Sequence, residues 1–293
     1  MTWNAAPPII LDFDGSVWPL AEDEMRIPLA EWQERIRFGC TMDALTSLGQ
    51  QLVLPEKYGC LFLGSGDYHH ISLLPLARLN DAGEPFELIV CDNHPDNMRY
   101  PSGVHCGSWI YQASRFKNIR HIHVLGITSG DIGLAHSLEN HISPFLSRRL
   151  TYWSIGRDAS WLTWLGRRDS CRRFDSADEL VDAFCYRPDI AAKLYLSIDK
   201  DVCRASLIKT NWDQGLFEWQ HLERLITACA DRLLGADVTG EISYYSYKSL
   251  FKRILAGLDG QLPELKADEL LAAQSSQRTL NCKIMKSLVA VTN

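Results

Sequence analysis

Six acidic and histidine residues have the types and spacing expected of metal ligands. They are His69, Asp92, His94, Asp96, Asp199 and Asp201. Alternate residues of an extended segment point the same way, so the D-x-H-x-D run at 92–96 presents three ligands on one side, and the D-x-D run at 199–201 presents two more. Oxygen and imidazole donors without a thiolate suit manganese and similar ions better than structural zinc. Because four carboxylates neutralise two divalent cations, the set predicts a pair of metal ions, which can share a water and hold it as hydroxide at neutral pH.

Each of these motifs closely follows a short apolar run with the composition of a buried strand. The predicted strands are residues 8–12, 58–64, 86–92, 121–127, 150–155, 193–199 and 236–242. Segments with helical spacing lie between them, for example 176–185 and 218–234, and Gly235 is expected to end the second. This alternation predicts an α/β fold with a mostly parallel central sheet and helices on both faces. Since the carboxyl ends of parallel strands meet at one edge, we expect the motifs to converge there.

Each motif also has a plainer explanation when it is taken alone. The 92–96 run fits a solvated loop, Asp199 and Asp201 fit a loop acid and a helix cap, and His69 fits a core or surface histidine. Because all of them follow apolar runs, the combination favours one site over three coincidences.

Composition and charge limit the classes of function. The chain has 293 residues, of which 46% are hydrophobic and 23% charged, and this predicts one folded domain over 1–293 with closing helices from about residue 261. The net charge of −6 offers no basic field for a nucleic acid. No apolar run approaches the ~20 residues that span a bilayer, the N-terminus lacks signal-peptide features, and the nine cysteines lack paired spacing. We therefore expect a cytoplasmic protein with reduced thiols that binds neither nucleic acid nor membrane.

Three segments, in order along the chain, resemble the metal motifs of the ureohydrolases, which are the arginases, agmatinases and their relatives. The segments are Gly66-Asp67-Tyr68-His69-His70, Asp92-Asn93-His94-Pro95-Asp96 and Ser197-Ile198-Asp199-Lys200-Asp201, and the family patterns are G-G-D-H-S, D-A-H-x-D and S-x-D-x-D. The resemblance covers residues 58–245 and implies a three-layer α/β/α sandwich of the arginase type. It also implies two manganese ions per subunit and hydrolysis of a guanidino group to an amine and urea. The complete ligand set argues against a one-metal zinc deacetylase of the same fold, and against a binding protein that has lost its ligands.

The same resemblance implies how the ligands are shared between the metals. Asp92 and Asp199 would bridge both ions, His69 and Asp96 would complete one coordination sphere, and His94 and Asp201 would complete the other. The first motif departs from the family because Tyr68 separates the aspartate from the histidine, so His70 remains an alternative to His69.

Two further residues are matched by resemblance to roles in the reaction. The segment Ser102-Gly103-Val104-His105-Cys106-Gly107 is similar to the S-G-N-L-H-G segment of arginases. This implies that His105 is the proton shuttle, with a histidine in a glycine-rich loop as the plainer alternative. Glu241 lies near the position of the carboxylate that holds the guanidinium in the family, but it stands four residues after Asp237 where the family has three.

The loop at 97–101 bears on the identity of the substrate. Asn97 and Ser102 would partly keep the contacts of arginases to the amino-acid end of the substrate, whereas Arg99 and Tyr100 are new. Together with D-N-H-P-D and G-S-G-D-Y-H-H, this loop resembles a divergent branch of peptide arginases, which convert arginine side chains of ribosomally made precursor peptides to ornithine. A small guanidine such as free arginine or agmatine is the alternative substrate. Related enzymes often form homo-oligomers, and the sequence leaves open whether this chain does so.

Three tryptophans, Trp153, Trp161 and Trp164, form an aromatic cluster in the sequence. Core packing is the favoured role for them, and a rim that grips a peptide is the alternative.

A second class of function is suggested by the N-terminal run Ile9-Ile10-Leu11-Asp12-Phe13-Asp14-Gly15-Ser16. It resembles the nucleophile motif of haloacid-dehalogenase-like phosphatases, in which Asp12 would attack phosphorus and Asp14 would act as the acid. No convincing later lysine and acid pair completes that set of motifs, so a phosphatase is the weaker alternative. In the ureohydrolase interpretation, the two acids would instead help to bind a cationic substrate.

Overall fold

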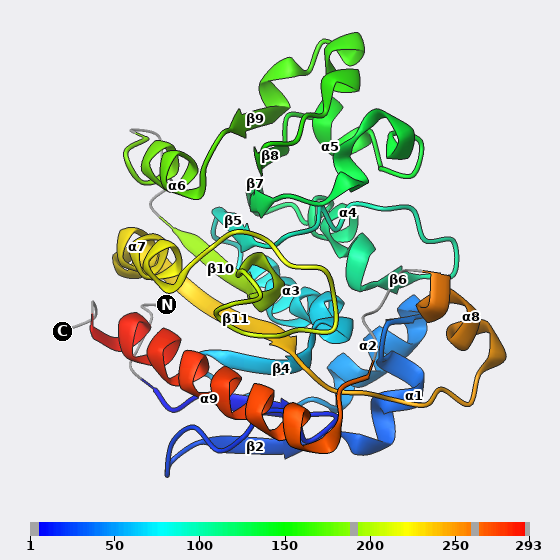
Figure 1. Ribbon diagram of the computed structural model, residues 1–293, viewed down its shortest axis with the longest axis vertical. Helices are drawn as coiled ribbons and strands as arrows, with labels where there is room; N and C mark the ends of the chain where they lie inside the picture. The colour runs from blue at the N-terminus through cyan, green and yellow to red at the C-terminus, as the bar shows by residue number, and fades with distance from the viewer. Residues whose placement is uncertain (1–5, 188–192, 259–263, 291–293) are drawn as a thin grey trace.

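The computed structural model describes residues 6–187, 193–258 and 264–290. Within them, nine strands form one sheet in the order β2-β1-β4-β11-β10-β5-β7-β8-β9, and every neighbouring pair is parallel (Figure 1). The strands are β1 (Ile9–Asp12), β2 (Met25–Pro28), β4 (Leu61–Ser65), β5 (Phe86–Cys91), β7 (Ile119–Ile127), β8 (Leu150–Ile155), β9 (Cys171–Phe174), β10 (Leu194–Asp199) and β11 (Leu233–Glu241). A separate antiparallel pair consists of β3 (Gly39–Cys40) and β6 (Val104–His105).

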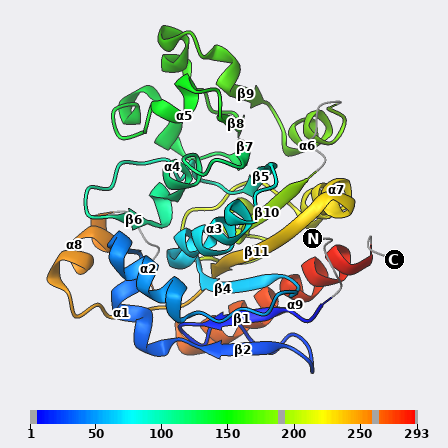
Figure 2. The ribbon, with the colours of Figure 1, turned by 180° about the vertical axis from the view of Figure 1, so that it is seen from behind.

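Helices cover both faces of the large sheet, which gives the predicted three-layer arrangement. The α-helices are α1 (Gln33–Ile36), α2 (Met42–Gln51), α3 (Leu73–Asp81), α4 (Trp109–Ala113), α5 (Ser143–Leu146), α6 (Ala177–Cys185), α7 (Trp219–Cys229), α8 (Leu250–Leu258) and α9 (Ala267–Ala290). Two opposite views place α6, α7 and α9 on one face and α2, α3 and α4 on the other (Figure 1, Figure 2). No helix in the described ranges is long and apolar enough to cross a membrane.

The strands supply side chains to a hydrophobic core under each helical layer. In β5, Leu88 and Val90 pack in the core that contains α2, α3 and α4, whereas Ile89 and Cys91 pack in the core that contains α6, α7 and α9. Successive strand residues face opposite sides, so a strand covered on both faces must be apolar throughout. This is why the central strands are continuous apolar runs in the sequence. All nine cysteines lie in the described residues, and each is a free thiol.

All seven predicted strands are confirmed, with boundaries shifted by a few residues. The two edge strands, β2 and β9, were not predicted, because their residues are exposed or half-buried and therefore lack an apolar run. The predicted helix at 218–234 is wrong at its C-terminal end. Helix α7 ends at Cys229, and Leu233 and Leu234 begin β11, because Leu233 pairs with Leu194 of β10 in the sheet. Of the closing helices expected from about residue 261, the structure describes α9, while residues 261–263 and 291–293 lie outside the described residues.

The strand order brings the predicted motifs to one edge of the sheet. Strands β4, β11, β10 and β5 are neighbours in its middle, and the chain passes from β4 to β5 across the space that β11 and β10 later fill. Connections diverge at such a point, and the loops that leave the carboxyl ends there form a crevice. The β3–β6 pair adds His105 beside this crevice. Gly39 permits that approach, because a Cβ atom on Gly39 would lie 2.7 Å from the Cβ of His105.

Candidate metal centre

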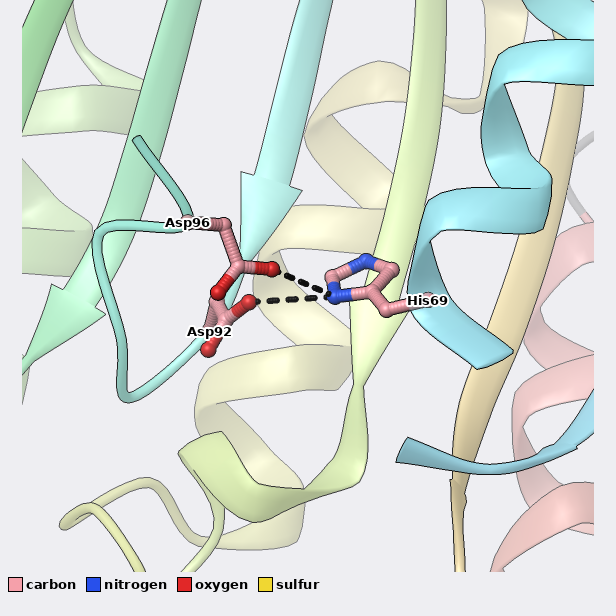
Figure 3. Close-up of side chains that lie close together, drawn as sticks. All are labelled: His69, Asp92 and Asp96. Carbon is pink, nitrogen blue, oxygen red and sulfur yellow. Dashed lines mark ion pairs between the residues drawn. The ribbon is translucent and has the colours of Figure 1, made fainter. Parts of the chain in front are cut away.

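The first group of predicted ligands surrounds the ring of His69. This residue lies in a 3-10 helix, η2 (Gly66–Ser72), directly after β4, and its Nδ1 atom is 3.0 Å from Asp96 Oδ2 and 3.2 Å from Asp92 Oδ2 (Figure 3). The Oδ2 atom of Asp199, the last residue of β10, is 3.6 Å from the same nitrogen. All four side chains are buried. Three carboxylates therefore converge on one imidazole nitrogen.

The second group surrounds His94 and shares Asp92 with the first. The Nδ1 atom of His94 is 2.9 Å from Asp201 Oδ2 and 3.6 Å from Asp92 Oδ1. Asp201 lies in η8 (Lys200–Val202), and its backbone N–H donates to Asp199 Oδ1 at 3.0 Å. Asp92 thus offers one oxygen to each group. His69 lies with Asp96, His94 lies with Asp201, and Asp92 is shared, as the resemblance implies, whereas the bridging role expected of Asp199 stays a prediction.

The donor sets fit divalent ions. His69 with Asp92 and Asp96, and His94 with Asp92 and Asp201, each hold their ligand atoms within 4.8 Å of one another. The Nδ1 atom of His69 and the Oδ2 atom of Asp92 are buried, face each other, and make no hydrogen bond of acceptable geometry. A cation between the two atoms would satisfy both of them.

The protonation of the cluster also fits a cation site. Burial and the charge of Asp92 raise the pKa of Asp96 to about 7 and that of Asp201 to about 7. Burial and the charge of Asp201 raise the pKa of Asp199 well above its ordinary value. Buried carboxylates this close cannot all be ionised without positive charge among them. The protons stand where divalent cations would otherwise neutralise the aspartates.

Further hydrogen bonds orient the first group. The Nε2 atom of His69 is 3.0 Å from Ser197 Oγ, and that hydroxyl donates to Asp237 Oδ1 at 2.6 Å. The indole N–H of Trp109 donates to Asp96 Oδ2 at 2.7 Å. Asp96 also has a φ of +48°, in the left-handed region that an aspartate tolerates better than most side chains. The ring of His70 is buried outside both groups, and burial lowers its pKa to about 3. Of the two histidines, the structure brings His69 to the aspartates.

A cavity of about 470 Å³ lies over both groups and is lined by all six predicted ligands. Among the residues that the structure describes, seven carboxylates and neither lysine nor arginine line it. The seven are Asp92, Asp96, Asp131, Glu139, Asp199, Asp201 and Asp213. Four of them would neutralise two metal ions, so the remaining three leave a negative wall that favours a cationic guest.

His105 lines this cavity as a neutral ring. Its Nδ1 atom accepts a hydrogen bond from the Gly107 N–H at 2.9 Å, and its side chain stacks on Phe38 with ring centroids 5.7 Å apart. Burial lowers its pKa to about 4, which differs from the ordinary value near 6.5 on which its predicted role as a proton shuttle depends. Because Nδ1 is the acceptor, Nε2 carries the proton at neutral pH.

Glu241 lies away from the cavity, in contrast to the position expected for a residue that holds the guanidinium. Its carboxylate accepts hydrogen bonds from the ammonium group of Lys200 and from Asn281 Nδ2 of α9, and all three side chains are buried. The cause is a bulge at Gly240, which has a φ of +89° and which the pairing of β11 with β4 skips. One extra residue turns the following side chain to the other face of a sheet. A Cβ atom on Gly240 would lie 2.5 Å from Asp199 Oδ1, so the position beside the ligands admits only glycine.

The structure does not bring the other two predicted substrate-binding residues to the cavity either. Asn97 is fully buried, and its amide donates to the backbone oxygen of His141 at 2.8 Å, so it joins two loops. Ser102 is exposed on the loop before β6. Met98 is the residue of this loop that faces the cavity.

The acids of the N-terminal motif take part in salt bridges outside the cavity. Asp12 pairs with Arg26 at 3.1 Å, and Asp14 pairs with the buried Arg37 at 3.3 Å and accepts a hydrogen bond from Ser243 Oγ at 2.6 Å. Arg37 also binds Asp67, at 2.7 Å. These contacts tie the ends of β1, β4 and β11 together. Neither acid lines the cavity.

The predicted tryptophan cluster divides between the core and the surface. Trp161 is buried and donates to the backbone oxygen of Ile132 at 2.9 Å, and Trp153 is buried against Phe174 and Phe184. Trp164 is 76% exposed. The favoured core role therefore holds for the first two.

Several residues of the cavity wall were not predicted to belong to the site, among them Asp131, Glu139, Trp212 and Asp213. Asp131 could have been predicted, because it follows the predicted strand at 121–127 in the same way that the other acidic residues follow their strands. Trp212 and Asp213 lie in the irregular segment between η8 and α7, where no local pattern indicates which residues turn toward the site.

Comparisons with known proteins bear on the fold. No protein-family model matches the chain. An uncharacterised protein of Thermotoga maritima is 27% identical over 240 residues, which cover 79% of this chain and 78% of that protein. Proclavaminate amidino hydrolase from Streptomyces clavuligerus is a similar solved structure, with 12% identity, a TM-score of 0.53, and coverage of 99% of this chain and 94% of that chain. Arginase from Medicago truncatula is similar with 12% identity, a TM-score of 0.53, and coverage of 96% of this chain and 87% of that chain. Trypanosoma cruzi formiminoglutamase with two Mn²⁺ ions is similar with 11% identity, a TM-score of 0.54, and coverage of 98% of this chain and 94% of that chain. The chain has the arginase-type α/β fold.

Proposed function

We propose that this arginase-fold protein is a two-metal hydrolase of guanidinium compounds and that manganese is its metal. The observation that carries the proposal is the pair of ligand groups joined by Asp92 beneath a cavity with an acidic wall. A guanidinium ion is planar, permanently charged and rich in N–H donors, so carboxylates are its natural partners. Solved structures of the same fold include one that holds two Mn²⁺ ions, which supports the choice of metal.

The residues of the chain divide the work between holding the ions and orienting the substrate. When bound, two divalent ions would lower the pKa of a shared water and supply a nucleophile at neutral pH. Asp92 belongs to both ligand groups and would hold both ions, and Asp131 and Glu139 of the cavity wall would face the charge of the guanidinium. His105 lines the cavity as a neutral ring whose Nε2 carries the proton.

The reaction balances as a hydrolysis of one C–N bond. The water oxygen bonds to the guanidino carbon, and the bond from that carbon to the alkyl-bearing nitrogen breaks. Both protons of the water end on the leaving nitrogen. The products are an alkylammonium ion and urea.

As the finer proposal, the guanidinium belongs to an arginine side chain of a precursor peptide, which becomes ornithine. A free arginine also carries an α-carboxylate, and the described wall of the cavity offers it neither lysine nor arginine. Asn97 and Ser102, the residues expected to contact that end, lie outside the cavity. A peptide lacks this free carboxylate at an internal arginine, and so does agmatine, the small-molecule alternative.

Mass spectrometry of the manganese-loaded protein distinguishes these substrates. The protein is incubated in parallel with arginine-containing peptides, free arginine and agmatine, with Asp92→Asn as the control. Loss of CH₂N₂ from a peptide supports both levels of the proposal, and turnover of a small guanidine alone refutes the peptide level. If none of them reacts although two Mn²⁺ ions are bound, the proposal is wrong.

A further inference from the structure

A carboxylate outside the two ligand groups contacts His94 on the side away from the aspartates. Asp213 lies in the segment between η8 and α7, and its Oδ1 atom is 2.8 Å from His94 Nε2. Its other carboxylate oxygen and its backbone oxygen accept hydrogen bonds from Asn93 Nδ2, at 3.0 and 3.1 Å. The backbone N–H of Asn93 donates to Asp201 Oδ1 at 3.0 Å. One side chain therefore holds both the histidine and the residue before it.

This contact decides which nitrogen of His94 is available to a metal. An ionised carboxylate accepts hydrogen bonds only, so the nitrogen that faces Asp213 must carry a proton. The lone pair of the neutral ring is then on Nδ1, the atom that faces Asp201 and Asp92. A carboxylate behind a ligating histidine fixes the orientation of the ring and makes it a stronger donor.

We propose that Asp213 is a positioning residue for the metal held by His94, Asp92 and Asp201, and that this metal depends on Asp213 whereas the metal at His69 does not. The inference rests on the two-metal site of the proposed function.

The two histidines differ in what supports them. His69 is backed by the hydroxyl of Ser197, which leads to Asp237 within the buried interior. The side chain of Asp213 is 66% exposed at the cavity. The segment that carries it is nevertheless held in place, because Gly215 N donates to Asp201 O at 2.7 Å and a Cβ atom on Gly215 would lie 2.4 Å from Val202 O. Removal of the carboxylate should therefore affect the metal and leave the fold intact.

Calorimetric titration of the metal-free protein with Mn²⁺ tests this without any substrate. We expect two ions to bind the wild type, and the Asp213→Asn variant to bind one of them about 10- to 100-fold more weakly with the other unchanged. Glu139→Gln is the matched control, because it removes one negative charge from the same cavity wall but contacts neither group. Glu139 is half-exposed and pairs with His136 at 2.9 Å.

The outcomes separate the inference from the proposed function. The inference is overturned if Asp213→Asn binds both ions as tightly as the wild type. It is also overturned if Glu139→Gln loses as much Mn²⁺ affinity as Asp213→Asn, because the effect would then be one of net charge. A wild type that binds no Mn²⁺ overturns both. If the wild type binds two ions and cleaves no guanidine, the inference still stands or falls on the Asp213→Asn titration. Asp213→Ala, with an unfolding midpoint measured without metal, controls for damage to the fold.

Discussion

Substitution of Glu241 distinguishes a structural carboxylate from one that binds substrate. In the structure, Glu241 and Lys200 form an ion pair in which both side chains are at most 2% exposed. Glu241→Gln keeps the shape of the side chain and removes its charge, which leaves a buried ammonium without a counter-ion. Breaking a buried pair in this way costs about 3–5 kcal/mol, and the retained amide oxygen places the expected loss near the lower end.

That loss converts into a measurable shift. With an unfolding entropy of about 2.1 cal/mol/K per residue, a chain of 293 residues has about 0.6 kcal/mol/K, so 3 kcal/mol lowers the midpoint of thermal unfolding by about 5 °C. Since the carboxylate lies outside the cavity, we expect kcat/KM at 25 °C to stay close to that of the wild type.

The assay combines thermal unfolding with steady-state kinetics on the substrate found by mass spectrometry. Glu223→Gln, on the exposed face of α7, is the control for loss of a carboxylate and should leave both quantities unchanged. The double variant Lys200→Met/Glu241→Gln removes both charges and should recover part of the stability. A Glu241→Gln protein that melts like the wild type but has lost most of its kcat/KM would refute the reasoning, because it would place Glu241 against the substrate.

Three further predictions concern the metal groups and His105. Asp92→Asn should weaken Mn²⁺ binding at both ligand groups, because Asp92 belongs to both. Titration with Mn²⁺ measures this, and wild-type affinity for even one ion would contradict the shared role. The pKa values of Asp96, Asp199 and Asp201 and of the two histidines His69 and His94 are all raised without metal, so Mn²⁺ should displace more than one proton at pH 7 and bind more weakly at pH 6. Binding heats in two buffers of different ionisation enthalpy count the protons. The pKa of His105 in the folded protein is about 4, below the value of about 6.5 in an unfolded chain. Its contribution to the free energy of unfolding is therefore complete above pH 6.5 and falls by about 2 kcal/mol by pH 5. Urea unfolding of the wild type at the two pH values should show this loss, and His105→Asn should not.

The ligand groups could be predicted because their geometry is local. The ligands of 92–96 and of 199–201 are close in sequence and follow the ends of neighbouring strands, which is sufficient to gather their side chains at one edge. The alternation expected of an extended segment is wrong in detail, because residues 93–94 form a bend, Asp96 has a φ of +48° and Asp201 lies in η8. The central strands could be predicted for a similar reason, since burial on both faces makes them continuously apolar. The edge strands β2 and β9 carry no such signal, and the end of α7 could not be separated from the start of β11, because both are apolar.

The residues around the substrate depend on longer paths of the chain. One bulge at Gly240 decides whether Glu241 faces the cavity. The four-residue spacing from Asp237 to Glu241 indicated a departure from the family, but it did not show to which face the side chain turns. Asp213 reaches His94 across a separation of 119 residues, through a segment with no regular structure. Such contacts are set by loop conformation, which the identity of neighbouring residues determines only weakly.

The displaced Glu241 has a consequence for how a cation is recognised in this fold. With its carboxylate bound to Lys200, the strand β11 contributes Gly240 to the side of Asp199, and a glycine offers the substrate no charge. The negative charge that remains beyond the metal ligands comes from Asp131, Glu139 and Asp213, which lie on segments that follow β7 and η8. Under the proposed function, the guanidinium would be recognised by loops at the mouth of the cavity and not by the sheet. Loops change at little cost to the fold, so under the proposed function the same ligand groups would serve a substrate as large as a peptide without any change to the sheet that holds them.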